Sequence, residues 1–164
     1  MQYDKLKHRK VQFLSLTSLD VSEFEFLLPY FKAEWDEYNR YFTLEGKPRQ
    51  RIFYPRKDSV LPYASDKLLF LLIYLKTNPL QEHHAASFGL TQSQCNLWLH
   101  SLSDILRKTL KNMGELPERN ALRVKNIIKN CENLFLDGTE RPIVRPLDDE
   151  LQEDYYSGKK NATA

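Results

Sequence analysis

An unbroken apolar run of eight residues, Leu68–Leu75, lies near the middle of the chain. In a helix these residues would be apolar around the whole circumference, and such a helix has to be buried at the centre of a fold. The helical pattern begins at Ser65 and ends at Asn78-Pro79, because Pro disfavours a helical conformation in the residue before it. A membrane span needs roughly 20 apolar residues. The run therefore predicts an interior helix and argues against a membrane protein.

The composition is typical of a compact cytoplasmic protein. The 164 residues suit one domain, or one domain plus a fragment of another. With 41% hydrophobic and 12% aromatic residues, the chain has too much bulky apolar material to be disordered. Cys95 and Cys131 are too few for a disulfide framework and lack metal-site spacing. Residues 1–19 lack the apolar stretch of a secretory signal, so we expect a reducing cytoplasm.

A long amphipathic helix is predicted from Val21 to Phe42. Asp20 can accept a hydrogen bond from the backbone of Glu23, whose side chain can reach back, as in a capping box. Pro29 lies inside the pattern and is expected to kink or split the helix. The apolar residues recur at steps of three and four and define one stripe: Phe24, Leu27, Leu28, Phe31, Trp35, Tyr38 and Phe42.

Two further helices, joined by a tight turn, are predicted directly after the apolar run. The first is Gln81–Phe88, and it ends at Gly89, where a left-handed backbone costs least. The second opens at Thr91, which has the capping-box spacing to Gln94, and it runs on to Met113. Two helices joined by a tight turn with Gly are the outline of a helix-turn-helix. Its expected packing residues are Ala85, Ala86, Leu90, Cys95, Trp98, Leu99 and Leu102.

The outward residues at the start of the second helix are the candidate DNA contacts. Their amides and hydroxyls can present donors and acceptors to base edges in the major groove, and Thr91 with the helix N-terminus can receive a phosphate. The alternative is that they are only helix caps, since residues 81–100 contain no Lys or Arg. His83 and His84 are predicted to be surface or boundary residues rather than ligands. The candidates for base contact are Gln92, Ser93, Gln94 and Asn96.

A basic loop, Gly46–Asp58, connects the long helix to the apolar run. Its charges fit either an arm laid along DNA phosphates or a solvated connector. Residues 1–130 carry a net charge of +6 and residues 131–164 a net charge of −4, and this asymmetry favours a polyanionic partner without proving one. The candidates for phosphate contact are Lys47, Arg49, Arg51, Arg56 and Lys57.

The pattern changes after a short helix that carries Leu122 and Ile128. The apolar run Leu134–Leu136, followed by Asp137-Gly138 and Ile143-Val144, predicts two strands joined by a hairpin turn. On this pattern alone Asp137 is a turn residue. The acidic residues between positions 148 and 154 form a surface run without metal-site geometry.

The order of these elements resembles the N-terminal part of bacterial insertion-sequence transposases of the DDE superfamily. The resemblance extends from about Leu19 to Lys160 and is carried by SDKLLFLLIYLKTNPLQEHHAASFGLTQSQCNLWLHSL, LFLDGTERPIVRP and YYSGKK. It implies a helical region that binds the terminal inverted repeats of a mobile element, followed by a ribonuclease-H-like catalytic domain. It also implies that Asp137 is the first carboxylate of the catalytic triad, which holds divalent metal ions for phosphoryl transfer.

The chain also departs from the family in three respects. The second and third carboxylates have no counterpart up to residue 164, and residues 161–164 (NATA) stand where the family has a basic strand. Leu97 is a smaller departure, at a position where the family often has a basic residue. We therefore expect Asp137 to be a catalytic and metal-binding residue only in a complete catalytic domain, with Mg²⁺ as the metal there and no cofactor in this chain. Transposase activity, the cleavage and transfer of DNA strands, is implied by the family but is not expected of this chain alone.

The expected fold is mainly α, with an N-terminal helical segment and basic loop (1–60) and a helix-turn-helix domain (61–130). A short C-terminal β-hairpin (131–164) would begin a truncated ribonuclease-H-like domain. The expected function is transposase-type binding of transposon-end DNA, in DNA transposition and recombination. One alternative is a regulatory subunit that oligomerises with itself or with the full-length transposase. Another is a nuclease that takes its remaining carboxylates from a second polypeptide. No membrane partner is expected.

Overall fold

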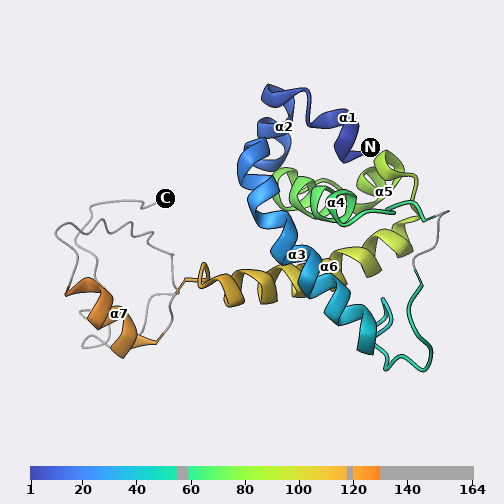
Figure 1. Ribbon diagram of the computed structural model, residues 1–164. Coiled ribbons are helices and arrows are strands. Elements are labelled where there is room, and N and C mark those ends of the chain that lie inside the picture. Colours follow the sequence, from blue (N-terminus) through green and yellow to red (C-terminus); the bar gives the residue numbers. More distant parts are fainter. Residues whose placement is uncertain (55–58, 118–119, 130–164) are drawn as a thin grey trace, which may run out of the picture. The chain divides into compact units, whose positions relative to one another are not determined.

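The computed structural model describes residues 1–54, 59–117 and 120–129 (Figure 1). These residues form helices and contain no β-strand, which confirms the mainly α prediction for them. Residues 1–117 make up one compact unit, and residues 118–164 belong to a second. The predicted hairpin, with Cys131, Asp137 and the acidic run, lies outside the described residues. The helices are α1 (Tyr3–Leu6), α2 (Lys10–Thr17), α3 (Val21–Tyr41), α4 (Ala64–Thr77), α5 (Gln81–Phe88), α6 (Gln92–Met113) and α7 (Ala121–Ile128).

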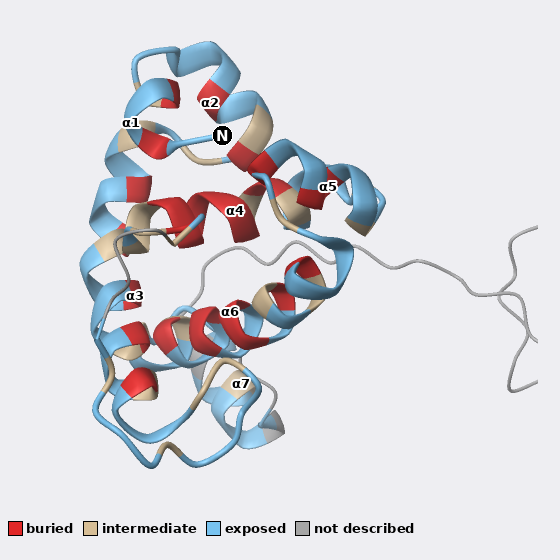
Figure 2. Ribbon diagram, turned by 90° about the vertical axis from the view of Figure 1, so that its right-hand side faces the viewer, coloured by how far each residue is buried: buried red, intermediate tan, exposed pale blue. Residues whose placement is uncertain are grey.

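The predicted interior helix is α4, which packs against α1, α2, α3 and α6. Figure 2 shows its buried residues between α3 and α6, which supply most of the remaining core. The expectation of burial around the full circumference needs one correction, because Leu75 in the last turn is 56% exposed. The buried apolar residues of α4 are Leu68, Leu69, Phe70, Leu71 and Ile73.

The N-terminal helices α1 and α2 were not predicted, and they complete one end of the core. The ring of Tyr3 stacks on that of Phe24 in α3 at 4.8 Å, and Phe13 packs edge-on to Phe24 at 5.3 Å between ring centroids. The backbone N–H of Tyr3 donates to Asp66 Oδ1 in α4 at 2.8 Å. Helices of four and eight residues are too short to be stable alone, so these tertiary contacts determine that they form.

The long helix α3 begins as predicted and is not interrupted by Pro29. Asp20 Oδ1 accepts from the backbone N–H of Glu23, and the Glu23 carboxylate accepts from the backbone N–H of Asp20, both at 2.8 Å. Hydrogen bonds from the Ser22 hydroxyl and the Glu23 backbone lower the pKa of Asp20. Pro29 is exposed, on the side of the helix where the backbone can adjust toward solvent. Of the two expected outcomes, a kink or a split, the split is absent, because α3 is continuous from Val21 to Tyr41.

The burial of His84 corrects the sequence prediction for that residue. Its side chain is 2% exposed in α5, and its Nε2 lies 3.0 Å from the carbonyl oxygen of Phe70, to which it donates in the Nε2–H tautomer. The ring is 4.4 Å from that of Phe70 and 5.0 Å from that of Phe88. Burial lowers the pKa of His84, and the hydrogen bond to Phe70 opposes that shift in part. His84 is thus a neutral core residue, whereas His83 is exposed as predicted.

Candidate nucleic-acid interface

The tight turn between α5 and α6 has the predicted geometry. Gly89 has a left-handed backbone with a φ of 72°, and its N–H donates to the carbonyls of Ala85 and Ala86 at the end of α5. Thr91 caps α6: its Oγ1 accepts from the backbone N–H of Gln94 at 3.3 Å, and its own N–H donates to Gln94 Oε1 at 3.0 Å. This capping box uses two of the backbone donors at the helix start. The backbone N–H groups of Gln92 and Ser93 are not part of it.

The packing face of this helical pair matches most of the sequence prediction. Cys95, Leu99 and Leu102 are buried on the inner face of α6, and burial raises the pKa of the Cys95 thiol. Ala85 is buried against α6, but Ala86 is exposed, so only one of the two small residues lies in the contact. The α5–α6 pair is therefore held by one face, and the other face of each helix remains in solvent.

The four candidates for base contact do not lie on one face of α6. Ser93 is exposed and Asn96 is half-buried, and neither side chain makes a hydrogen bond with another described residue. The Nε2 of Gln92 donates to Gln81 Oε1 in α5 at 3.1 Å. The side-chain carbonyl of Gln94 belongs to the capping box. This side chain lies on the side of α6 that carries Trp98. Ser93 and Asn96 are thus the candidates whose side-chain polar atoms have no hydrogen-bond partner among the described residues.

Sequence reasoning missed the continuation of the outward face along α6. His100 follows Ser93 by seven residues, or about two helical turns, and it is exposed together with Leu97. The period of 3.6 residues, counted outward from Ser93 rather than inward from Cys95, would have identified this stripe. Its exposed members are Ser93, Leu97, His100, Asp104, Arg107 and Lys111.

The basic loop supplies two exposed cations and one that is engaged inside the protein. Lys47 pairs with Glu45 at 2.8 Å, and Arg51 is exposed. Arg49 is half-buried: its Nε donates to the carbonyl of Phe42 at 3.1 Å, and its guanidinium lies 5.0 Å from the ring centroid of Phe53. The remaining two candidates for phosphate contact, Arg56 and Lys57, lie outside the described residues.

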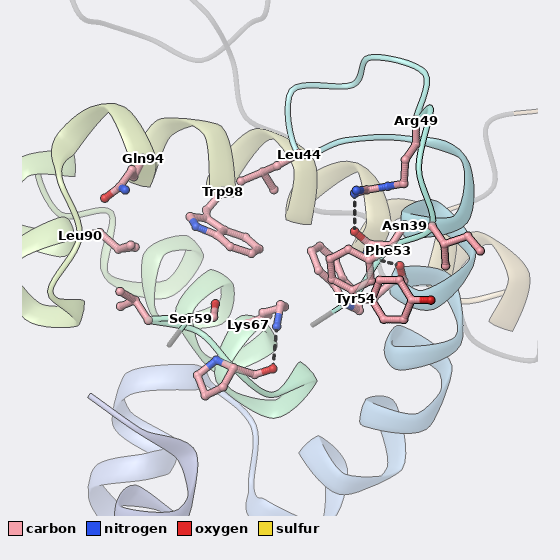
Figure 3. Close-up of a pocket in the computed structure, with 14 residues that line it drawn as sticks. Asn39, Leu44, Arg49, Phe53, Tyr54, Ser59, Lys67, Leu90, Gln94 and Trp98 are labelled. Atoms are coloured by element: carbon pink, nitrogen blue, oxygen red, sulfur yellow. Dashed lines mark hydrogen bonds between the residues drawn. The ribbon is translucent and has the colours of Figure 1, made fainter. Parts of the chain in front are cut away.

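A pocket of about 640 Å³ lies beside the start of α6, on the side of Gln94 and Trp98. Figure 3 shows side chains from α3, α4, α6 and the α3–α4 connection pointing around it. Trp35 of α3 and Trp98 stack with their ring centroids 5.6 Å apart. Phe53 meets Trp35 edge-on at 6.5 Å. The wall is therefore rich in flat aromatic surface.

Lys67 closes the floor of this pocket, and it is 5% exposed. Its Nζ donates to the carbonyls of Leu61, Pro62 and Tyr63 at 2.6, 3.2 and 3.4 Å (Figure 3 shows the bond to Pro62). It also lies 4.9 Å from the ring centroid of Trp35. Burial lowers the pKa of Lys67 to about 8, opposed by the charge of Asp66. All three of its donors are directed at backbone carbonyls, so Lys67 ties this connection to α4.

The comparison with known families addresses the helical core. Residues 61–112 match the family model described as the helix-turn-helix of DDE superfamily endonuclease. The match begins before α4 and ends in the last turn of α6, so it covers α4, α5 and α6 together. This segment of the chain is therefore similar to the helix-turn-helix of DDE superfamily endonucleases. No curated protein and no solved structure gave a significant match to the chain.

The described part of the chain contains neither a membrane-spanning helix nor a cluster of metal ligands. No helix there has both the length and the apolarity that crossing a membrane requires. No group of three or more His, Cys, Asp or Glu side chains among those residues could hold a metal ion. The catalytic and Mg²⁺-binding role implied for Asp137 concerns a residue outside this part.

Proposed function

We propose that this protein is a transposase-type DNA-binding protein that recognises the terminal inverted repeats of a mobile element through the first turns of α6. The support is the coincidence of two independent facts. The α4–α6 segment matches the helix-turn-helix of DDE superfamily endonucleases. In the same segment, Ser93 and Asn96 carry polar side-chain atoms that no described residue satisfies. In helix-turn-helix proteins the second helix lies in the major groove with its N-terminal residues at the base edges.

The phosphate contacts in this proposal come from the ends of the reading helix and from the basic loop. The hydroxyl proton of Thr91 and the backbone N–H groups of Gln92 and Ser93 lie at the positive end of the helix dipole, which attracts a phosphate. Lys47 and Arg51 of the basic loop are exposed and can reach solvent anions. Arg56 and Lys57 complete the proposed set. These contacts would position α6 on the duplex. The side chains of Ser93 and Asn96 and the side-chain carbonyl of Gln92 would then contact base edges.

The experiment is a fluorescence-anisotropy titration with two labelled duplexes: one taken from the inverted repeats that flank the gene, and one scrambled duplex of the same composition. We expect tighter binding to the repeat duplex. Asn96→Ala and Ser93→Ala should each weaken that binding by about 5- to 150-fold, the equivalent of ~1–3 kcal/mol per base contact. Ser15→Ala, at an exposed position of α2, is the matched control. Equal affinity for the two duplexes would overturn specific recognition.

The second candidate function is a regulatory subunit that oligomerises with itself or with the full-length transposase. The observation that favours it is a set of exposed apolar side chains on α2 and α3. Val11 is 86% exposed and Phe26 is 63% exposed, with Leu14 and Tyr30 also in solvent. Sedimentation velocity of the wild type and of Val11→Ser/Phe26→Ser distinguishes the two functions. A concentration-dependent dimer that the double variant abolishes, together with no duplex affinity, would favour the regulatory function.

A further inference from the structure

The described residues that line the pocket beside α6 give it a positive charge, which favours negatively charged ligands. Among the described residues that line it, Arg49 and Lys67 are the only charged ones, and none of them is Asp or Glu. Lys67 is saturated by three carbonyls, so it supplies positive potential rather than a contact. Arg49 uses its Nε and, at 3.5 Å to Asn39 Oδ1, its Nη2, while its Nη1 makes no hydrogen bond with any described residue. The pocket therefore favours an anion at Arg49.

The aromatic wall has free hydrogen-bond donors. The indole N–H groups of Trp35 and Trp98 make no hydrogen bond within the described chain. Because no buried side-chain nitrogen among the described residues lacks a partner, these two N–H groups are accessible to solvent. Tyr54, at the mouth of the pocket, is 75% exposed and makes no contact with another described ring. Flat aromatic faces together with unused donors suit a planar ring that carries acceptor atoms.

We infer that this pocket binds one unpaired nucleotide of a DNA strand, with its base among Trp98, Phe53 and Tyr54 and its phosphate at Arg49. Base–aromatic stacking tolerates any base and is a common mode of single-strand binding. The volume of about 640 Å³ is within the range of small-ligand pockets. A free mononucleotide carries the same base and phosphate. The experiment therefore has to distinguish a nucleotide within a DNA strand from a free one.

The placement of the pocket favours a strand over a free nucleotide, and this step rests on the proposed function. Gln94 and Trp98 line the pocket and belong to the first two turns of α6. Ser93, the proposed base contact, immediately precedes Gln94 on the same helix. A strand that leaves a duplex bound at Ser93 would thus enter the pocket from its nearest side. The inferred role of Arg49 is accordingly to hold the phosphate of the unpaired nucleotide.

The protein contains its own reporter for the test, because both of its Trp residues line this pocket. Intrinsic Trp fluorescence of the full chain is titrated with three probes: the single strand (dT)₈, an abasic strand of the same length, and dTMP. We expect (dT)₈ to quench the fluorescence and to bind about 5- to 150-fold tighter than the abasic strand, the ratio for one stacked base at ~1–3 kcal/mol. We expect dTMP to bind much more weakly than (dT)₈.

Two pairs of variants locate the effect in the pocket. Tyr54→Ala and Arg49→Gln should weaken (dT)₈ binding, whereas Tyr41→Ala and Arg40→Gln, at exposed positions of α3 outside the pocket, should not. Circular dichroism confirms that each variant is folded. Equal binding of (dT)₈ and the abasic strand, or no change in Trp fluorescence, would overturn the inference. Equal affinity for dTMP and (dT)₈ would overturn the assignment to a strand.

The failure of this inference is distinguishable from the failure of the proposed function. Repeat-specific duplex binding without Trp quenching by (dT)₈ would overturn the pocket assignment alone. Quenching by (dT)₈ together with equal affinity for repeat and scrambled duplexes would overturn repeat recognition alone. Ser93→Ala provides the internal check, because it should weaken duplex binding and leave (dT)₈ quenching unchanged.

Discussion

The polar residues of α4 and those at the start of α6 have opposite environments. In α4, Asp66 and Lys67 are buried, and each finds partners inside the protein, in the backbone of Tyr3 and in three carbonyls of the α3–α4 connection. At the start of α6, Ser93 and Asn96 have no side-chain partner among the described residues. A buried polar group without a partner costs free energy, whereas an exposed one can exchange water for a ligand. Polarity in α4 therefore serves folding, and polarity in α6 remains available for binding.

The largest expected effect tests the folding side of this comparison. Phe70→Ala removes a fully buried ring that contacts His84 and Phe88, and it should lower the free energy of unfolding by about 3–5 kcal/mol. Urea denaturation measures the change. The control is Leu75→Ala at the exposed end of the same helix, which should cost far less. Similar losses for the two variants would contradict the interior position of α4.

The next effect concerns Lys67. Lys67→Met leaves three carbonyls without their donor and should cost about 1–3 kcal/mol at pH 7. The folded-state pKa of Lys67, about 8, lies below the ordinary value of 10.5, so the unfolded chain binds more protons between these values. The contribution of Lys67 to stability should therefore rise with pH from about 8 toward 10.5. Denaturation curves over that range should show this rise in the wild type relative to the variant, and parallel curves would contradict it.

A smaller effect is expected at Thr91, which caps α6 and also belongs to the proposed phosphate site. Thr91→Ala removes the acceptor for the backbone N–H of Gln94 and should cost about 1 kcal/mol of stability. It should also weaken duplex binding, because the hydroxyl belongs to the proposed phosphate site. Asp20→Ala at the capping box of α3 is the comparison, since it should cost similar stability and leave DNA affinity unchanged. A loss of affinity in both variants would indicate a general effect of helix destabilisation.

The smallest effect on stability is expected in the basic loop. Lys47→Gln removes an exposed cation whose only ion pair among the described residues is with Glu45, and exposed pairs contribute little. The free energy of unfolding should change by less than about 0.5 kcal/mol. The dependence of the logarithm of duplex affinity on the logarithm of salt concentration should become shallower by about 1. An unchanged salt dependence would remove Lys47 from the phosphate contacts.

Much of the fold could be predicted because it depends on local signals. The apolar run specifies α4, the two capping boxes specify the starts of α3 and α6, and Gly89 specifies the turn between α5 and α6. Each of these signals lies within a few residues of the feature that it determines. The helix-turn-helix was therefore predicted with nearly the observed boundaries.

The rest depends on contacts between residues that are distant in the sequence. His84 is buried because α4 lies over it, and α1 forms because Asp66, 63 residues later, receives its backbone. The aromatic pocket combines residues from α3, α4, α6 and a connection whose sequence resembles a solvated loop. Periodicity within one segment contains no information on such neighbours. Of the proposed base contacts, it also assigned Gln94 to the outward face, although that side chain is used by the cap and lines the pocket.

The length of α6 has a mechanical consequence. Its 22 residues form a rod of about 33 Å, with the proposed reading end at Thr91 and the far end at Gly114, close to where the first compact unit finishes. Because α3 packs against this rod and Ser101 is bonded to the carbonyl of Leu44 in the connection after α3, the two helices would pivot together. A tilt of about 10° imposed by a docked duplex at one end would displace the other by roughly 6 Å, from the helical rise alone. Contact with DNA at Thr91 would in this way shift Gly114 at the opposite end of α6.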